Sequence, residues 1–270
     1  MIYCFNKITN FIKKIKLEVA LRNKIFPQPL SSKKDVLESL IKLKPKKTNY
    51  ELLRLGPDND GGYLIPNDIE GISACFAPGV SRESGFEFDL ANHGIDIFLA
   101  DKSVDGPSLQ HSKFSFIKKH IGVVNDKNYI TLDNWCNVNA PNGDLILQMD
   151  IEGAEYEVIL STSINLLQRF RIIIIELHNL HYIWAKTIRN FIDITLKKLT
   201  IGHKVVHIHP NNCCGYLLFN GIKIPRIVEV TFMRNDRCSN TNEYTAILPN
   251  PLDQPNISTK PELEIPEYWT

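Results

Sequence analysis

Short apolar runs alternate with segments of helical spacing through the middle of the chain. The apolar runs predict strands at residues 72–76, 95–100, 115–117, 145–149, 171–175 and 204–208. The segments between them predict helices at residues 86–92, 132–136 and 188–199, and one that ends near residue 167. A closing antiparallel pair is expected from residues 227–233 and 245–248. Strands that alternate with helices favour a mostly parallel sheet with helices on both faces, so the predicted fold class is α/β.

The first part of the chain follows a different pattern. Its apolar side chains at helical spacing have lysines between them, which predicts a basic amphipathic helix. These apolar positions are Phe5, Ile8, Ile12, Ile15 and Val19. Two prolines then end this helix, and a Ser-Ser pair can cap a second one. We therefore expect a basic helical N-terminal extension at residues 1–48, a main domain at 49–248 and an extended, Pro-rich tail at 249–270.

The formal net charge of +1 is the sum of two opposite excesses. Residues 1–48 contain 12 Lys and Arg against 3 Asp and Glu, so the rest of the chain is mildly acidic. This acidic body has no stripe of aromatic and basic side chains, which argues against nucleic acid as a partner. We expect the lysine face of the basic extension to be solvated. The alternatives are packing on the body, a homo-oligomer, or attraction of an anionic sugar nucleotide or of a membrane surface in peripheral contact.

Composition and hydropathy are those of a globular protein, with 43% hydrophobic and 23% charged residues. No apolar run is long enough to cross a bilayer, and no signal-peptide pattern opens the chain, so we expect a cytoplasmic protein. The six cysteines show no metal-binding spacing. We expect free thiols, with a strained disulfide between the adjacent Cys213 and Cys214 as the alternative.

A glycine turn and an aspartate follow the first two predicted strands. Gly79 allows a tight turn after the first strand, and the serines that follow, Ser81 among them, can begin a helix that points at a ligand. Asp101 ends the second strand, 22 residues after Gly79, where a carboxylate can bind ribose hydroxyls. Together they favour a cofactor that contains a nucleoside. The alternatives are an ordinary turn and a solvated loop aspartate.

Acidic and histidine residues follow three later strands. Asp150 is the first residue of an Asp-Ile-Glu-Gly-Ala-Glu run. Glu176 and His178 lie two residues apart at the end of the next strand, and because successive side chains of a strand point to opposite faces, both are expected to point to the same side. On the strand after that, His207 and His209 are likewise expected to share a face. Because the carboxyl ends of parallel strands meet at one edge, these groups can converge on a divalent metal such as Mg²⁺, Mn²⁺ or Fe²⁺. The alternative is a metal-free site with one histidine as general base.

A polar segment at residues 54–63 precedes the first of these strands. Its Asp-Asn-Asp sequence lacks the spacing of a calcium loop. It is a candidate lid over the site, with Asp60 facing the cofactor. The alternative is a Gly-Gly turn after which Tyr63 begins a strand.

Six segments of the chain resemble the FkbM-type methyltransferases. They lie at residues 56–63, 84–91, 149–155, 175–178, 209–212 and 225–232. The most specific is the acidic run at 149–155. The resemblance covers about residues 50–235 and implies S-adenosylmethionine as the cofactor. It also implies a Rossmann-like sheet of seven strands, the last of them antiparallel.

The resemblance also assigns roles to the candidate cofactor-binding residues. Gly79 would approach the methionine end of the cofactor, and Asp101 would bind its ribose. Ser81, Glu87 and Asp60 are further candidates for contact with it.

Among the candidate catalytic residues, Asp150 would lie near the sulfonium and the acceptor. Asp150 and Glu176 occupy places where related methyltransferases hold a divalent metal. His178 and His209 are candidates both for completing that metal shell and for catalysis. Some surface-sugar methyltransferases resembling this chain are iron-dependent, which would suit histidine ligands.

The reaction implied is O-methylation of a sugar hydroxyl, on a nucleotide-activated sugar or another glycan precursor for a surface, for example capsular, polysaccharide. A divalent metal would assist deprotonation of the hydroxyl. Two alternatives remain open. One is a metal-free methyltransferase of another small metabolite, and the other is a non-catalytic module that binds nucleotide and docks through its basic helix.

Overall fold

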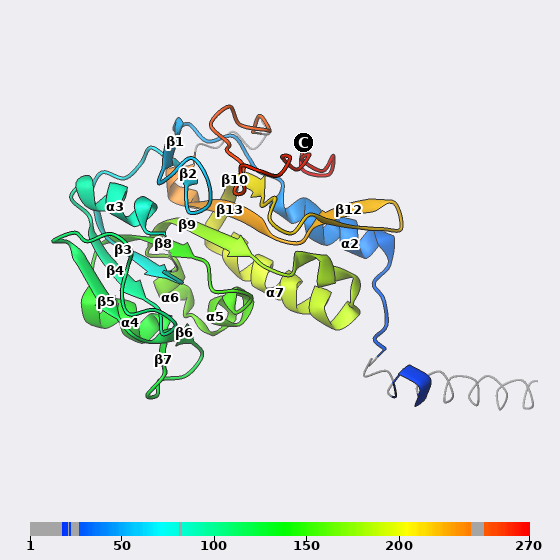
Figure 1. Ribbon diagram of the computed structural model, residues 1–270, viewed down its shortest axis with the longest axis horizontal. Helices are drawn as coiled ribbons and strands as arrows, with labels where there is room; N and C mark the ends of the chain where they lie inside the picture. Colours follow the sequence, from blue (N-terminus) through cyan, green and yellow to red (C-terminus); the bar gives the residue numbers. More distant parts are fainter. Residues whose placement is uncertain (1–17, 21, 23–26, 81–82, 239–245) are drawn as a thin grey trace, which may run out of the picture.

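A seven-stranded sheet forms the centre of the molecule, with strand order β10-β13-β9-β8-β3-β4-β5 (Figure 1). The computed structural model describes residues 18–20, 22, 27–80, 83–238 and 246–270. The strands of the sheet are β3 (Ile72–Pro78), β4 (Asp96–Ala100), β5 (Phe114–Ile117), β8 (Asp144–Met149), β9 (Phe170–Leu177), β10 (His203–Pro210) and β13 (Val228–Arg234). Neighbours from β5 to β9 pair in parallel, whereas β13 is antiparallel to both β9 and β10. The expectation of a mixed α/β fold with a mostly parallel sheet is confirmed.

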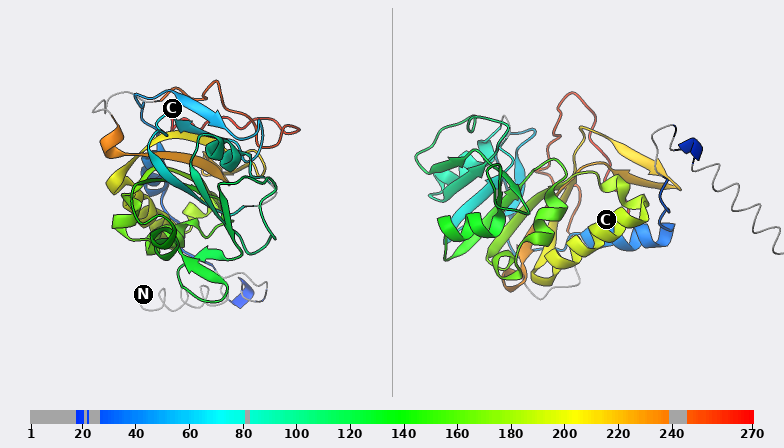
Figure 2. Two further views of the ribbon diagram at one scale, coloured as in Figure 1. Left: turned by 90° about the vertical axis from the view of Figure 1, so that its left-hand side faces the viewer. Right: turned by 90° about the horizontal axis from the view of Figure 1, so that it is seen from below.

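Both faces of the sheet are covered, and the strand sequences show why. The side chains of β9 alternate between two buried clusters: Ile173 and Ile175 join one, and Ile172 and Ile174 join the other. A strand buried on both faces carries a continuous apolar run. The larger cluster also contains side chains from five α-helices: α2 (Lys33–Leu40), α4 (Leu132–Asn139), α5 (Glu155–Ser161), α6 (Ile164–Leu167) and α7 (Lys186–Gly202). The other contains α3 (Gly85–Asn92) and the pair β1 (Leu52–Leu55) and β2 (Tyr63–Pro66), as the two views of Figure 2 allow the reader to follow.

Several short elements escaped the sequence analysis. Two further two-stranded pairs are parallel β6 (His120–Gly122) with β7 (Tyr129–Thr131), and antiparallel β11 (Tyr216–Phe219) with β12 (Ile222–Pro225). Three 3₁₀ helices are η1 (Ile41–Leu43), η2 (Leu180–Trp184) and η3 (Asn235–Arg237). Strands of three or four residues carry too few positions for a period of two to stand out.

Two expected elements differ in the structure. The helix that was expected to end near residue 167 is two helices, α5 and α6 (Ile164–Leu167), because the Ser163 side chain caps a new helix by accepting from the Leu166 N–H. The expected closing pair is wrong: β13 pairs with β9 and β10, and residues 246–248 form no strand. Residue 245 and most of the expected first helix, residues 5–17, lie outside the described residues.

The C-terminal segment, residues 249–270, contains no helix or strand but is not an extended tail. Trp269 is fully buried, and its indole Nε1 donates a hydrogen bond of 2.9 Å to the Leu40 carbonyl of α2. Val36 and Leu43 lie in the same cluster, so the second predicted helix also belongs to the core. The proline-rich composition did not indicate that a tryptophan anchors this segment to the core.

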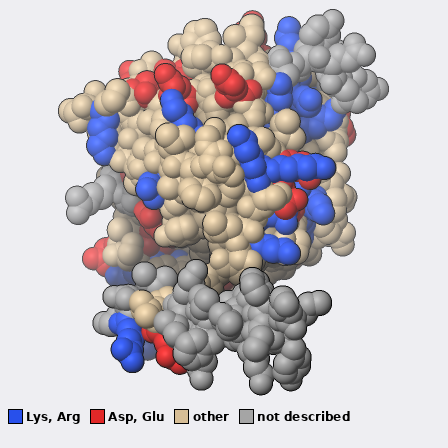
Figure 3. Space-filling view, turned by 90° about the vertical axis from the view of Figure 1, so that its right-hand side faces the viewer, with Lys and Arg blue, Asp and Glu red and all other residues tan. Residues whose placement is uncertain are grey.

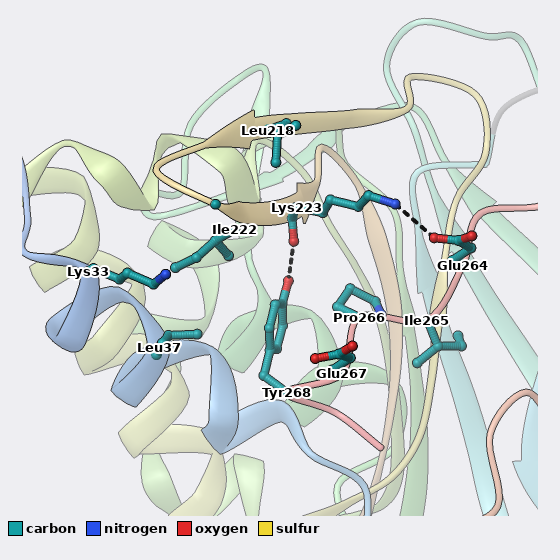
Figure 4. Close-up of a pocket in the computed structure, with 11 residues that line it drawn as sticks. Lys33, Leu37, Leu218, Ile222, Lys223, Glu264, Ile265, Pro266, Glu267 and Tyr268 are labelled. Atoms are coloured by element: carbon teal, nitrogen blue, oxygen red, sulfur yellow. Dashed lines mark hydrogen bonds and ion pairs between the residues drawn. The ribbon is translucent and has the colours of Figure 1, made fainter.

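A cleft of about 600 Å³ lies between α2, the β11–β12 hairpin and the C-terminal segment (Figure 4). Tyr268 donates from its hydroxyl to the Lys223 carbonyl at 2.8 Å, and Lys223 pairs with Glu264 at 2.8 Å.

Figure 3 shows this end of the molecule, where Lys and Arg side chains are interspersed with Asp and Glu. No helix among the described residues has the length and hydropathy needed to cross a membrane.

Candidate functional site

A cavity of about 460 Å³ opens at the carboxyl ends of β3, β4 and β8. Four of the residues chosen from the sequence line it: Asp60, Gly79, Asp101 and Asp150. Lining residues that the sequence analysis did not select include Ser103, His120, Ile121, Tyr129 and Glu157. Ligands of open parallel sheets bind outside these strand ends, so the cavity is the candidate active site.

Gly79 is required by a close approach between two strand ends. Its φ is +93°, and a Cβ built on it would lie 1.5 Å from the Asp150 carbonyl oxygen. The Gly79 N–H donates to the Ala100 carbonyl at 3.0 Å, and the Asp150 N–H donates to the Pro78 carbonyl at 3.3 Å. The ends of β3, β4 and β8 are therefore tied together at a point where no side chain fits.

Asp101 is oriented by its own loop. Its Oδ1 accepts from the Ser103 N–H at 2.6 Å and from the Ser103 hydroxyl at 2.7 Å. Across the cavity, the rings of His120 and Tyr129 lie 5.4 Å apart, beside the buried Ile121. The last three come from β6 and β7, whose shortness explains why the sequence did not indicate them.

Glu87 is buried on α3 and lines a small adjoining cavity together with Asp60, Gly79 and Asp150. Burial raises the pKa of the Glu87 carboxyl to about 7. Ser81, the remaining candidate for cofactor binding, lies outside the described residues.

Glu155 holds the turn that carries Asp150. Its Oε1 accepts from the N–H groups of Ile151, at 3.0 Å, and Gly153, at 3.1 Å. Between them Glu152 has a φ of +57°, a left-handed conformation that is costly for a residue with a Cβ. Surrounding contacts must hold such a conformation in place, and the fully buried Glu155 carboxylate supplies two of them. The sequence analysis recognised this acidic run but did not identify Glu155 as its organiser.

Glu155 also orients His178. The His178 Nδ1 lies 3.0 Å from Glu155 Oε1, while Nε2 lies 3.5 Å from Glu152 and 3.8 Å from Asp150. A carboxylate only accepts, so a proton is assigned to Nδ1. In the neutral imidazole the Nε2 lone pair then faces Asp150 and Glu152, and in the imidazolium Nε2 carries a second proton that these carboxylates favour. Burial acts to lower the pKa of His178, but the surrounding carboxylates, Glu155 first, outweigh it and raise the pKa.

Asp150 is the carboxylate most affected by this environment. Burial is the main cause that raises its pKa to about 7, and the negative charges of Glu152, Glu155 and Asp60 add to it, while His178 opposes them. Such a group can exchange a proton near neutral pH.

Glu176 belongs to a different group of side chains from His178. Asp60, Glu176 and Glu229 each place a carboxylate oxygen within 4.8 Å of the others, and Asp150, Glu152 and His178 form a second such group. The reason is that β9 ends at Leu177, so strand alternation does not extend to His178. Burial raises the pKa of Glu176 well above its usual range, with repulsion from Asp150 and Glu229.

His207 and His209 of β10 contact the C-terminal segment. A register shift separates Val205 from His207. The His207 Nε2 lies 2.9 Å from Asp253, and His209 lies between Glu229, at 3.6 Å from Nδ1, and Glu262, at Nε2. The four residues proposed as metal ligands therefore divide: Asp150 lies with His178, Glu176 lies with Asp60 and Glu229, and His209 lies on the far side of Glu229.

A model of the FkbM methyltransferase domain matches residues 45–205, more than half of the chain. The chain belongs to the FkbM methyltransferase family. The matched region contains the strands from β1 to β9 and most of the cavity, whereas Glu229 and the C-terminal segment lie beyond it. A search of curated proteins gave no match to this chain.

Two glycines allow a matched test of the strand-end contact in this FkbM domain. Gly79 and Gly94 have nearly equal positive φ values, +93° and +89°, but a Cβ at Gly94 would meet nothing within 4 Å. Alanine at either position should cost about 1–2 kcal/mol of stability for its backbone conformation. Gly79→Ala should cost about 1–3 kcal/mol more, because it forces the Asp150 turn to move. Urea unfolding measures both, and equal losses would contradict the close approach.

The contacts of His209 predict a pH-dependent stability. Burial acts to lower its pKa, but Glu229 and then Asp253 and Glu262 outweigh it and raise the pKa from 6.5 to about 9. The stabilisation should be complete below pH 6.5 and lost as the pH rises through about 9. Glu262→Gln should therefore cost about 1 kcal/mol at pH 6, since Glu262 is partly exposed, and much less at pH 10.

Thermal unfolding across this range provides the check, with the exposed Glu267→Gln as the control. A deficit of the same size at every pH would show that His209 does not hold Glu262 through its charge.

Proposed function

We propose that this chain is an S-adenosylmethionine-dependent O-methyltransferase that acts on a sugar hydroxyl, on a nucleotide-activated sugar used for surface polysaccharide. The cavity at the carboxyl ends of β3, β4 and β8 is the observation that carries this proposal. Its volume of about 460 Å³ falls in the range of small-molecule sites. The sheet, with its antiparallel β13, is consistent with the Rossmann-like arrangement expected for such an enzyme.

The residues of the cavity fit the proposed cofactor. Gly79 leaves the backbone accessible to a ligand, and the Asp101 carboxylate can accept hydrogen bonds from ribose hydroxyls. His120 and Tyr129 offer ring faces for a base. Asp150 and Glu152 create a negative potential that favours a cationic ligand. When bound, S-adenosylmethionine supplies an electrophilic methyl group on a positively charged sulfonium.

His178 is the proposed general base for the acceptor hydroxyl. Its Nε2 lone pair faces the same turn as Asp150, and Glu155 stabilises the imidazolium that forms when Nε2 takes the proton. Asp150 would position the hydroxyl by accepting its hydrogen bond. A divalent cation near the acceptor would lower the pKa of the hydroxyl, and both groups of carboxylates contain donors suited to one.

Binding of the cofactor can be tested separately from catalysis. Asp101→Ala should weaken S-adenosylmethionine binding by at least about tenfold, because it removes hydrogen bonds to a charged acceptor. Asp105→Ala is the matched control, since this side chain is 97% exposed and lies on the same loop outside the cavity. Isothermal titration calorimetry measures both. If the wild-type chain takes up no S-adenosylmethionine, the proposal fails.

Methyl transfer is tested by mass spectrometry of reactions with a panel of nucleotide-linked sugars. The rate should rise with pH, as Asp150 loses its proton near pH 7 and as His178, whose pKa the surrounding carboxylates raise, loses its own. His178→Gln should lower turnover by about 10²–10⁴-fold, whereas His93→Gln, an exposed position on α3's C-terminal end, should not change it. Absence of any methylated sugar, or full activity of His178→Gln, would contradict the proposed acceptor or the proposed base.

A further inference from the structure

Four side chains from distant parts of the chain surround one point next to the cavity. Asp60 comes from the loop between β1 and β2, Glu176 from β9, Glu229 from β13, and Asn256 from the C-terminal segment. The three carboxylates have oxygens within 4.8 Å of one another, and the Asn256 Nδ2 donates to Glu229 and, at 3.1 Å, to Asp60. Glu176, Glu229 and Asn256 are 4%, 7% and 6% exposed.

The negative charge of this group exceeds what its neighbours balance. Glu176 accepts from the neutral Asn211 amide at 2.7 Å. Among the described residues, the only cationic group in an ion pair with any of the three carboxylates is His209, which also pairs with Glu262. The two buried carboxylates, Glu176 and Glu229, repel each other and have lost hydration, whereas Asp60 is exposed, so a bound cation would stabilise the buried pair.

Asn256 provides the independent observation that a ligand belongs here. In the part of the chain that the structure describes, its Oδ1 is buried and has no hydrogen-bond partner. Leaving a buried carbonyl oxygen without a partner costs about 1–3 kcal/mol. The same amide contacts two of the carboxylates through Nδ2, so the side chain is directed at the group, and its Oδ1 is available as a fourth oxygen donor.

The position of Asn256 is fixed from both sides. Its carbonyl accepts from the Asp60 N–H at 3.2 Å, and the next residue, Ile257, donates from its N–H to the Asn212 side chain at 2.8 Å. A contact of 2.9 Å between Asp253 Oδ1 and His207 Nε2 attaches the same segment to β10. The segment therefore holds a preorganised donor against the end of the sheet.

We propose that Asp60, Glu176, Glu229 and Asn256 bind one divalent cation through oxygen atoms alone. Three carboxylates and an amide carbonyl are hard donors, which suit Mg²⁺ or Mn²⁺ better than metals that prefer nitrogen or sulfur. The group of Asp150, Glu152 and His178 is less suited to such a cation, because it offers two carboxylates and an imidazole nitrogen rather than oxygen donors alone. This proposal deepens the proposed function by separating the cation site from the general base.

Titration of the full-length protein with MnCl₂, without S-adenosylmethionine or acceptor, tests the site. Wild-type protein should bind about one Mn²⁺ and unfold at a higher temperature in its presence. Glu176→Gln and Asn256→Ala should each weaken Mn²⁺ binding at least about tenfold and remove most of the thermal shift. Glu176→Gln keeps the hydrogen bond from Asn211, so the variant should stay folded, as circular dichroism can verify.

Glu152→Gln is the control that distinguishes the two groups, and it should bind Mn²⁺ like the wild type. Absence of binding by the wild-type chain, unchanged affinity in both Glu176→Gln and Asn256→Ala, or a selective loss in Glu152→Gln would each overturn the proposed site. These outcomes are distinguishable from failure of the proposed function. Mn²⁺ binding without S-adenosylmethionine binding would refute the methyltransferase alone, and methyl transfer by protein that binds no Mn²⁺ would refute the cation site alone.

Discussion

Parallel strands bring their carboxyl ends to one edge of the sheet, and in this chain an acidic residue lies at or directly after the end of three of these strands. Asp101 follows β4, Asp150 follows β8 and Glu176 ends β9. Burial and repulsion by neighbouring carboxylates act on Asp150 and Glu176, and this is the constraint on which the arrangement of the site depends, since a buried carboxylate needs a donor or a cation nearby. Asp101 accepts hydrogen bonds from the N–H and hydroxyl groups of a serine, and Glu176 accepts one from an asparagine amide. His178 lies near Asp150. The negative charge around Glu176 is the least balanced by neighbouring groups, so a cation would stabilise the fold most at this point.

The same constraint explains why backbone strain and a buried acid occur together in the 150–155 turn. Gly79 lets the turn contact the end of β3, and Glu155 holds it from the other side by accepting two N–H groups. Since the same carboxylate oxygen accepts from His178, the shape of the turn and the direction of the imidazole are set together. A change at Glu155 would therefore disturb the position of Asp150 and the tautomer of His178 at once.

Local signals predicted much of the fold and part of the site. The strand blocks, Gly79 and the acids at strand ends follow from short-range pattern and from the rule that parallel strands share an edge. Glu229 and Asn256 could not be found this way, because each reaches the site only through pairing with distant strands or by packing of an irregular segment. Trp269 shows the same limit: nothing near it in the sequence indicates that it fills the core beside α2.

The chain divides into the region that matches the FkbM domain model and the region that follows it, and this division has a physical basis. Residues 45–205 contain the strands whose ends form most of the cavity, and the cavity needs only their backbone geometry and a few side chains. Glu229 lies on β13, which is inserted between β9 and β10, so its position depends on antiparallel pairs with both. Asn256 depends in turn on β10, since His207 and His209 bind the segment that carries it. The residues proposed for the cofactor and the general base therefore lie within the matched region, whereas two of the four proposed cation ligands, Glu229 and Asn256, follow it. Substitutions at these two residues should change cation binding while leaving cofactor binding intact.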